Sequence, residues 1–145
     1  MHLVRSRVGP SARRIALPIR VGFDLVSVSA VEAELHADTR ERYLARIYTD
    51  AEVAECATPR GLNAERLAAR FAAKEATIKV LPVTDTGFSL REIETQRAAS
   101  GQIHLKLTGT AAQLALSGGL THLALSITHE AGMAGAVVVA EYHLG

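Results

Sequence analysis

The chain has 145 residues, of which 48% are apolar and 21% charged, a balance typical of one globular domain with its own core. Its formal net charge is +1, and its single cysteine, Cys56, excludes an internal disulfide and fits a reducing compartment, so we expect a cytoplasmic protein. No apolar run is long enough for a membrane span, and the first residues lack the apolar segment of a secretory signal. We therefore expect no membrane association.

The small net charge conceals a basic N-terminus. The first 20 residues carry five arginines and no acid, whereas the remainder holds 11 basic and 15 acidic residues. We interpret residues 1–18 as a basic, flexible arm and residues 19–145 as a single domain. The arm either frays or contacts an acidic partner. No aromatic residue lies among its arginines, so we expect no nucleic-acid binding.

The first elements are predicted from β-branched residues and capping signals. Apolar and β-branched residues predict a strand over Ile19–Val28, which Asp24 interrupts. A short helix follows, with Ser29 as its expected N-cap. The segment Thr49–Glu52 is a capping box and predicts the start of another helix.

The longest predicted helix occupies the middle of the chain. It runs over Ala64–Val80, with Asn63 as N-cap and Pro82 beyond its end, because proline cannot continue the hydrogen-bond ladder. Alternating patterns and glycine turns then predict four strands and one short helix, over residues 90–95, 102–109, 109–119 (the helix), 122–130 and 131–142. This order predicts an α+β domain, with a small antiparallel sheet packed on one long helix.

Two carboxylates in apolar surroundings are the candidate chemistry. Glu75 and Lys79 lie four residues apart on the long helix, a spacing that by itself indicates an exposed ion pair of about 0.3 kcal/mol. However, the residues flanking Glu75 are mostly apolar, and an unpaired Asp24 inside an apolar strand would be costly. A magnesium ion shared by Asp24 and Glu75 resolves both, because Mg²⁺ binds few carboxylates together with phosphate oxygens. Lys79 would then face the same phosphates.

Three segments together resemble a known family. "GFDLVSV" (22–28), "RFAAKEATIK" (70–79) and "LSITHEAGMAGAVVV" (125–139) are similar, in order and spacing, to the signature blocks of holo-acyl-carrier-protein synthase. This is the small, trimeric class of 4′-phosphopantetheinyl transferases. The second block is the most specific of the three.

The resemblance implies transfer of the phosphopantetheine arm of coenzyme A to a serine of an apo acyl carrier protein, with release of 3′,5′-ADP. It implies catalytic roles for Asp24, Glu75 and Lys79, with the two carboxylates holding Mg²⁺ and Lys79 near the coenzyme A phosphates. Glu75, directly or through a water molecule, is the candidate acceptor of the serine proton. The resemblance also implies a homotrimer with sites between subunits.

Further positions are candidates for coenzyme A binding. By resemblance, Arg70 and Lys74 match basic positions of the second block, with Arg70 near the nucleotide. His129 matches a histidine at the 3′-phosphate or adenine end, or else it is a strand-end histidine bonded to backbone. Ser126 and Thr128 either line the nucleotide pocket or cover a solvated strand face.

The chain also departs from the family pattern. Ala30 stands where the family has an arginine that helps to dock the carrier, and Pro82 and Val83 replace flexible residues. Three arginines on one short helical segment could attract an acidic carrier in place of the missing arginine: Arg40, Arg42 and Arg46. The alternative is that they only form a solvated helix face. These departures leave an alternative function: a weak or non-enzymatic relative that binds a dedicated carrier domain of a larger synthase.

Overall fold

A computed structural model describes residues 18–82, 85 and 87–143. The predictions for residues 1–17 of the N-terminal arm and for Val83 therefore lie outside the described residues. The elements in chain order are β1 (Ile19–Ser27), α1 (Val28–His36), α2 (Arg40–Ile47), α3 (Asp50–Cys56), β2 (Ala57–Thr58), β3 (Gly61–Leu62), α4 (Ala64–Ile78), the 3₁₀ helix η1 (Leu90–Glu92), β4 (Ile93–Arg97), β5 (Ile103–Leu107), α5 (Gly109–Ser117), β6 (Leu120–Glu130) and β7 (Met133–Tyr142). Within the described residues, no helix has the length and apolarity needed to cross a membrane.

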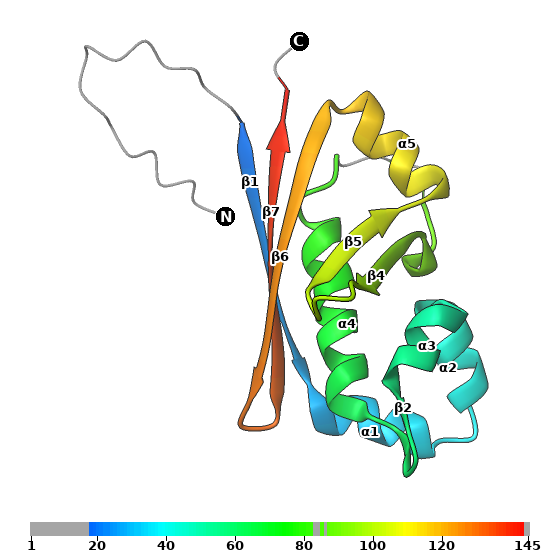
Figure 1. Cartoon of the computed structure of the whole chain (residues 1–145). Helices are drawn as coiled ribbons and strands as arrows, with labels where there is room; N and C mark the ends of the chain where they lie inside the picture. The colour runs from blue at the N-terminus through cyan, green and yellow to red at the C-terminus, as the bar shows by residue number, and fades with distance from the viewer. Residues whose placement is uncertain (1–17, 83–84, 86, 144–145) are drawn as a thin grey trace.

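A three-stranded antiparallel sheet forms one layer of the domain, in the order β1-β7-β6. Helix α4 lies along one face of this sheet, and the other helices lie beyond α4 (Figure 1). The hairpin of β4 and β5 is a separate two-stranded sheet beside α4 and β6. The predicted α+β class, with a small antiparallel sheet on one long helix, is confirmed.

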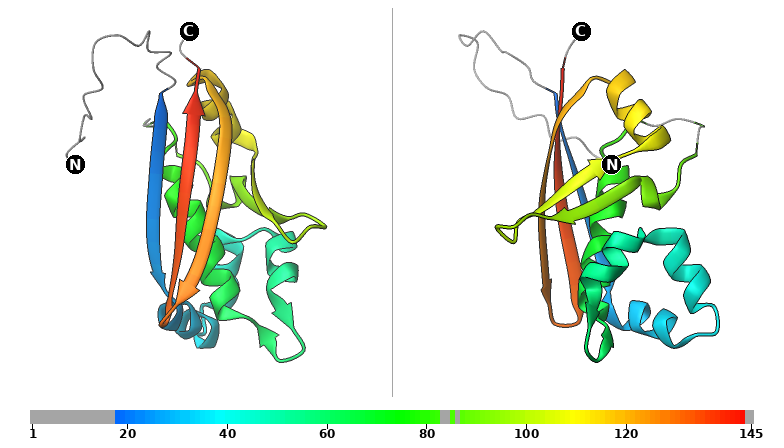
Figure 2. Two further views of the ribbon diagram at one scale, coloured as in Figure 1. Left: turned by 60° about the vertical axis from the view of Figure 1, so that its left-hand side comes forward. Right: turned by 45° about the vertical axis from the view of Figure 1, so that its right-hand side comes forward.

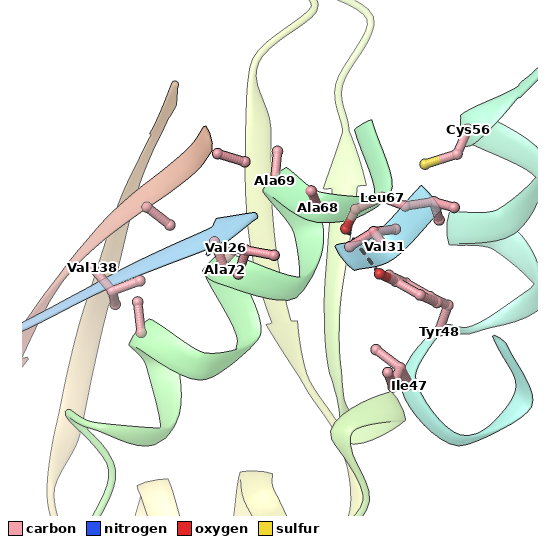
Figure 3. Packing of buried hydrophobic residues seen from close by; sticks show 14 of the residues in the cluster. Val26, Val31, Ile47, Tyr48, Cys56, Leu67, Ala68, Ala69, Ala72 and Val138 are labelled. Atoms are coloured by element: carbon pink, nitrogen blue, oxygen red, sulfur yellow. Dashed lines mark hydrogen bonds between the residues drawn. The ribbon is translucent and has the colours of Figure 1, made fainter. Parts of the chain in front are cut away.

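The core lies on both sides of α4. On the sheet side, the buried Ala72 of α4 lies near Val26 of β1 and Val138 of β7, and on the other side the buried Leu67 lies near Tyr48 and Cys56 (Figure 3). Small alanines on α4 allow the helix to lie close to the strands, so this core is built mainly from alanine, valine and leucine, with Tyr48 and Tyr142 as its buried aromatic residues.

The opposite face of the sheet carries the alternate side chains of the same strands, as their period of two requires. Val21, Phe23 and Leu25 of β1 point to this face and are more than half exposed. No element among the described residues covers it (Figure 2).

The long helix ends at Ile78 rather than Val80, and two further boundaries differ from the sequence prediction for a clear physical reason. Ser27, not Ser29, caps α1, because its backbone is still extended and its side chain accepts the amide of Ala30. The expected strand over residues 90–95 begins only at Ile93. A second capping box, in which Ser89 and Glu92 bond each other's backbone amides, closes the preceding residues into η1. The predicted caps Thr49 and Asn63 are confirmed.

Candidate active site

A glycine brings strand β1 against helix α4. A Cβ atom at Gly22 would overlap the carbonyl oxygen of Ala76, so only glycine permits this approach. Asp24 lies two residues further along β1 and therefore on the same face, toward α4. The "GFD" sequence thus sets both the contact between the two elements and the position of the carboxylate.

Asp24 meets the C-terminal turns of α4. The Lys79 Nζ lies 3.3 Å from the Asp24 Oδ1 and donates a hydrogen bond of 2.6 Å to the carbonyl of Phe23. Glu75 lies in α4, one turn before Lys79, which is the C-cap of the helix. Partial burial raises the pKa of Glu75, the charge of Asp24 raises it further, and Lys79 opposes them. The structure therefore brings Asp24, Glu75 and Lys79 together, as their proposed shared role requires.

A cavity of about 710 Å³ opens beside Glu75. Glu75 and Phe71 of α4 form one part of its lining, and Phe88, Ser89 and Leu90 form another. The remaining lining residues come from β1, α1 and α2: Val26, Ala30, Val31, Glu34, Tyr43, Arg46 and Ile47. Largely apolar walls with a few charged groups among them, here Glu34, Glu75 and Arg46, are typical of a substrate pocket.

Two residues that the sequence analysis linked to carrier docking lie at this cavity. Ala30, which stands where the family pattern has an arginine, lines it, and so does Arg46 of α2. Of the three arginines proposed to attract a carrier, Arg46 is thus the one at the cavity. Arg42 is exposed and Arg40 is half-buried, on the same helix.

A second group of predicted residues lies near the N-terminal half of α4. The Nδ1 atom of His129 lies 3.1 Å from the Glu65 Oε2, and its side chain is more than half exposed. His129 and Arg70 line a pocket of about 440 Å³, together with Arg66 and Arg97. Sequence reasoning missed Arg66 and Arg97. The only signal for Arg66 was its position one turn before Arg70, and Arg97 lies on a distant hairpin.

Arg70 is almost fully buried at this pocket. Its Nη2 donates to the Glu55 Oε2 at 2.9 Å and its Nη1 to the carbonyl of Arg66 at 3.3 Å. Its Nε is buried without a hydrogen-bond partner within the described part of the chain. Contact between Arg70 and a nucleotide remains a prediction.

One chain does not unite the two groups. Glu65, which contacts His129, precedes Glu75 by ten residues, a distance of about 15 Å along the helix. Ser126 and Thr128 are exposed on the face of the sheet that points away from α4, opposite Val137 and Gly135 of β7. The structure therefore separates Ser126 and Thr128 from both pockets of their own chain.

Lys74 is a correction to the sequence prediction. Its side chain is fully buried, and its Nζ donates to the Glu52 Oε1 and to the carbonyls of Leu90 and Ile93. An ammonium group has three N–H donors, and all three are used inside the domain. Lys74 is therefore not placed to contact coenzyme A. Its counter-ion, Glu52, was recognised in the sequence only as part of a capping box.

The donor set at Asp24 and Glu75 fits a divalent cation. The described residues hold no group of three or more His, Cys, Asp or Glu side chains that would form a metal site of protein ligands alone. Two carboxylates close enough for one to raise the pKa of the other match the few oxygen ligands that Mg²⁺ takes from a protein. Phosphate oxygens and water would complete such a site.

Known proteins resemble the chain over most of its length. The family model "4′-phosphopantetheinyl transferase superfamily" matches residues 20–138. A holo-[acyl-carrier-protein] synthase from Desulforudis audaxviator is 38% identical over 120 residues, covering 83% of this chain and 90% of the relative. One from Anaeromyxobacter sp. (strain K) is 39% identical over 123 residues, covering 83% and 94%.

Solved structures have the same fold. The ACPS–CoA complex of Chronobacterium ammoniagenes superimposes with a TM-score of 0.73 at 31% identity, covering 87% of this chain and 98% of that one. The Helicobacter pylori holo-[acyl-carrier-protein] synthase, also in complex with coenzyme A, gives 0.70 at 27% identity, covering 83% and 99%. The chain belongs to the 4′-phosphopantetheinyl transferase superfamily.

Proposed function

We propose that this chain is a holo-acyl-carrier-protein synthase, which transfers 4′-phosphopantetheine from coenzyme A to a serine of an apo acyl carrier protein. The observation that carries the proposal is the meeting of Asp24 and Lys79 with Glu75, which lines a cavity large enough for a substrate. The relatives named as this enzyme, two of them with coenzyme A bound, support it.

The reaction is a displacement at phosphorus. The serine Oγ of the carrier bonds to the β-phosphorus of coenzyme A, and the bond from that phosphorus to the bridging oxygen breaks. The leaving 3′,5′-ADP takes the bonding electron pair. Glu75 accepts the serine proton, directly or through a water molecule, and its raised pKa makes it a stronger base than an ordinary glutamate. The Lys79 ammonium neutralises charge that grows on the phosphate oxygens.

Asp24 and Glu75 are the residues that would hold Mg²⁺. When bound, the ion supplies positive charge to the phosphate oxygens and lowers the barrier to displacement. Lys79 is the partner of Asp24, at 3.3 Å. Because Lys79 is half exposed and Asp24 partly so, the two groups are free to exchange partners when charged phosphates arrive.

Coenzyme A would contact both groups of residues through an assembly of copies of this chain. The pocket with His129, Arg70, Arg66 and Arg97 is rich in cationic side chains and suits the 3′-phosphate and the nucleotide. It lies about 15 Å along α4 from Glu75. Its pairing with the Asp24 group of a neighbouring subunit would complete one site.

The uncovered face of the sheet is the proposed contact between subunits. Phe23 is 52% exposed, and Val21 and Leu25 beside it are similarly exposed. A contiguous apolar patch of this kind marks a protein interface. Ser126 and Thr128 lie on the same face, so a trimer would place them at the interface. Light scattering should show a trimer for the wild type and smaller species for Phe23→Asp, whereas a monomeric wild type would contradict the assembly.

The cavity beside Glu75 is the proposed docking point of the carrier. Its apolar walls suit an apolar side chain near the carrier serine, and Arg46 at its lining suits the acidic surface of a carrier. Ala30 leaves room where the family pattern has an arginine. The position of the attracting charge therefore differs from the family pattern, while the reaction stays the same.

Carrier loading is the direct test of the function. Incubation of the protein with apo acyl carrier protein, coenzyme A and Mg²⁺ should raise the carrier mass by one phosphopantetheine group, as measured by mass spectrometry. No mass shift with carriers of both the fatty-acid and the polyketide type would contradict the transferase proposal.

The second candidate, a weak or non-enzymatic relative that binds a dedicated carrier domain, is favoured by Ala30 at the cavity. Calorimetry separates the two functions. An active transferase should bind coenzyme A in a Mg²⁺-dependent manner, whereas a relative that only binds a carrier should bind that carrier without coenzyme A.

A further inference from the structure

A buried ion pair lies directly behind the candidate active site. Glu52 of α3 and Lys74 of α4 are both 0% exposed, and the Lys74 Nζ lies 2.6 Å from the Glu52 Oε1. Lys74 immediately precedes Glu75, so the two side chains leave the same turn of α4 in different directions: one into the interior, the other toward the cavity. The proposed reaction uses Glu75 and leaves Lys74 without a role.

The hydrogen bonds of this pair join four elements. Lys74 donates to the carbonyls of Leu90 in η1, at 3.0 Å, and Ile93 in β4, at 2.7 Å. The Glu52 Oε2 accepts from the amide of Thr95 at 3.0 Å and from its hydroxyl at 2.8 Å. The Glu52 Oε1 also accepts from the Thr49 amide at 2.9 Å, so every carboxylate oxygen of Glu52 and every ammonium donor of Lys74 is hydrogen-bonded. The segment 90–95 is thereby joined to α4 and α3 at several points.

That tied segment begins in the wall of the cavity. Phe88, Ser89 and Leu90 line the cavity together with Phe71 and Glu75 of α4. The bond from Lys74 to the Leu90 carbonyl therefore connects one wall of the cavity to the turn that carries Glu75 on the other wall. It fixes the distance between the wall and the proposed proton acceptor.

We propose that Lys74 and Glu52 are positioning residues, which hold the wall at residues 88–90 in register with Glu75 so that the carrier serine is aligned for attack. This inference rests on the proposed transferase function. Neither residue contacts a substrate. Their action is on the shape of the cavity where the carrier docks, and hence on the carrier rather than on coenzyme A.

A positioning role can be separated from a contribution to stability by experiment. A buried ion pair can often be replaced by uncharged residues of similar volume with little loss of stability, whereas removal of one partner leaves a buried charge and is strongly destabilising. The two charges can therefore be removed together to keep the fold while the bonds from Lys74 to the wall are lost. This gives a test that separates positioning from folding.

The test compares Lys74→Met, Glu52→Gln and the double variant Glu52→Gln/Lys74→Met. The double variant should be more stable than Lys74→Met, because no carboxylate is left buried without its counter-ion. Its kcat/KM for the carrier should nevertheless stay about 10- to 100-fold below the wild type, as expected for misplaced reacting groups. Its KM for coenzyme A should stay within about twofold of the wild type, because Asp24 and Lys79 are untouched.

Tyr142→Phe is the matched control. It removes another buried hydrogen bond of the α4 region, from the Tyr142 hydroxyl to the Val80 carbonyl, and leaves the 88–95 segment alone. It should lower the melting temperature without changing kcat/KM for the carrier. If the double variant regains wild-type kcat/KM, or if the control loses as much, the pair is only structural and the proposal is wrong.

Amide hydrogen exchange gives a measurement that does not depend on turnover. In the double variant, the amides of residues 90–95 should exchange faster than in the wild type, while those of α4 stay protected. Unchanged exchange in this segment would also overturn the proposal. A wild-type protein that fails to load any carrier would contradict the proposed function, a result distinct from either outcome here.

Discussion

Two lysines five residues apart, Lys74 inside α4 and Lys79 at its C-cap, have opposite surroundings. Lys74 is fully buried against Glu52 with every N–H donor used, whereas Lys79 is 51% exposed and contacts Asp24 at 3.3 Å. The buried pair forms one fixed arrangement with its neighbours. The exposed pair is held weakly by contacts that water, a metal ion or a phosphate can replace.

The difference indicates that the two pairs have different roles. The buried pair holds the surrounding helices and strand in place, whereas Asp24, Glu75 and Lys79 remain accessible to ligands. Sequence alone does not distinguish the two lysines, because both lie in the "RFAAKEATIK" block and both follow apolar residues. Burial distinguishes them, and burial depends on what the rest of the chain packs against each residue.

The largest expected effect is at Glu75. Glu75→Gln should lower carrier loading by at least about 100-fold, because it removes the proposed proton acceptor and a metal ligand. It should not lower the melting temperature, because it also removes the repulsion between Glu75 and Asp24. Carrier mass spectrometry and thermal unfolding measure the two effects.

Glu32→Gln, on the exposed surface of α1, is the control and should change neither quantity. Retained activity in Glu75→Gln would mean that the carboxylates at the C-terminal end of α4 are not the reaction centre.

The two lysines themselves give the sharpest contrast. Lys74→Met should destabilise the fold by about 3–5 kcal/mol, because it leaves the Glu52 carboxylate buried and unpaired. Lys79→Met should change stability by less than about 1 kcal/mol, because its pair is exposed, yet it should raise KM for coenzyme A and lower turnover. Urea unfolding and steady-state kinetics on the same preparations test both. Equal destabilisation by the two variants would remove the distinction.

The part of the fold that depends on local signals could be predicted from the sequence. Thr49 and Asn63 are side-chain caps whose partners lie three residues away, so a short segment of sequence determines where each helix begins. Ser29 was the wrong cap because Ser27 and Ser29 both precede an apolar stretch. The choice between them depends on where the pairing of β1 with β7 ends, at Ser27 opposite Met133.

Sequence reasoning selected candidate site residues only where a family motif or a carboxylate among apolar residues marked them, and their roles stay predictions. Asp24 and Glu75 are carboxylates among apolar residues, a costly arrangement that indicates a function. Lys74 shares the same block, and nothing local showed that Glu52, 22 residues earlier, would meet it in the interior. The cavity wall at Phe88 likewise depends on the tertiary placement of η1 beside α2 and α4, which no spacing in the sequence encodes.

The pH dependence of Mg²⁺ stabilisation should be smaller but diagnostic. The folded-state pKa of Glu75 is raised by burial and by Asp24, so the folded protein binds a proton more tightly than the unfolded chain does. Without metal, stability should therefore fall as the pH rises from the unfolded-state pKa to the folded-state pKa. With Mg²⁺, the added stability should be present above the folded-state pKa and disappear as the pH falls through it, because a protonated carboxyl cannot bind the ion.

Thermal melts across this pH range, with and without Mg²⁺, measure the effect, and Glu75→Gln serves as the control in which Mg²⁺ should have no influence at any pH. If the rise in melting temperature on addition of Mg²⁺ is independent of pH, or persists in Glu75→Gln, then the ion binds elsewhere.

The smallest expected effect is at Arg46. It tests whether this exposed arginine acts through its accessible charge, as Lys79 does, or through its packing in the structure, as Lys74 does. Arg46 is exposed at the cavity that is the proposed docking point of the carrier. Arg46→Ala should lower kcat/KM for an acidic carrier by about 3- to 10-fold at low salt through slower association, without loss of stability. The loss should shrink as salt rises, because exposed charges are screened over roughly 10 Å at moderate ionic strength.

The matched control is Arg60→Ala, which removes an exposed arginine from the turn between β2 and β3. If both variants lose the same activity, or if the loss at Arg46 does not depend on salt, then α2 does not attract the carrier and the role of Arg46 is confined to packing at the cavity.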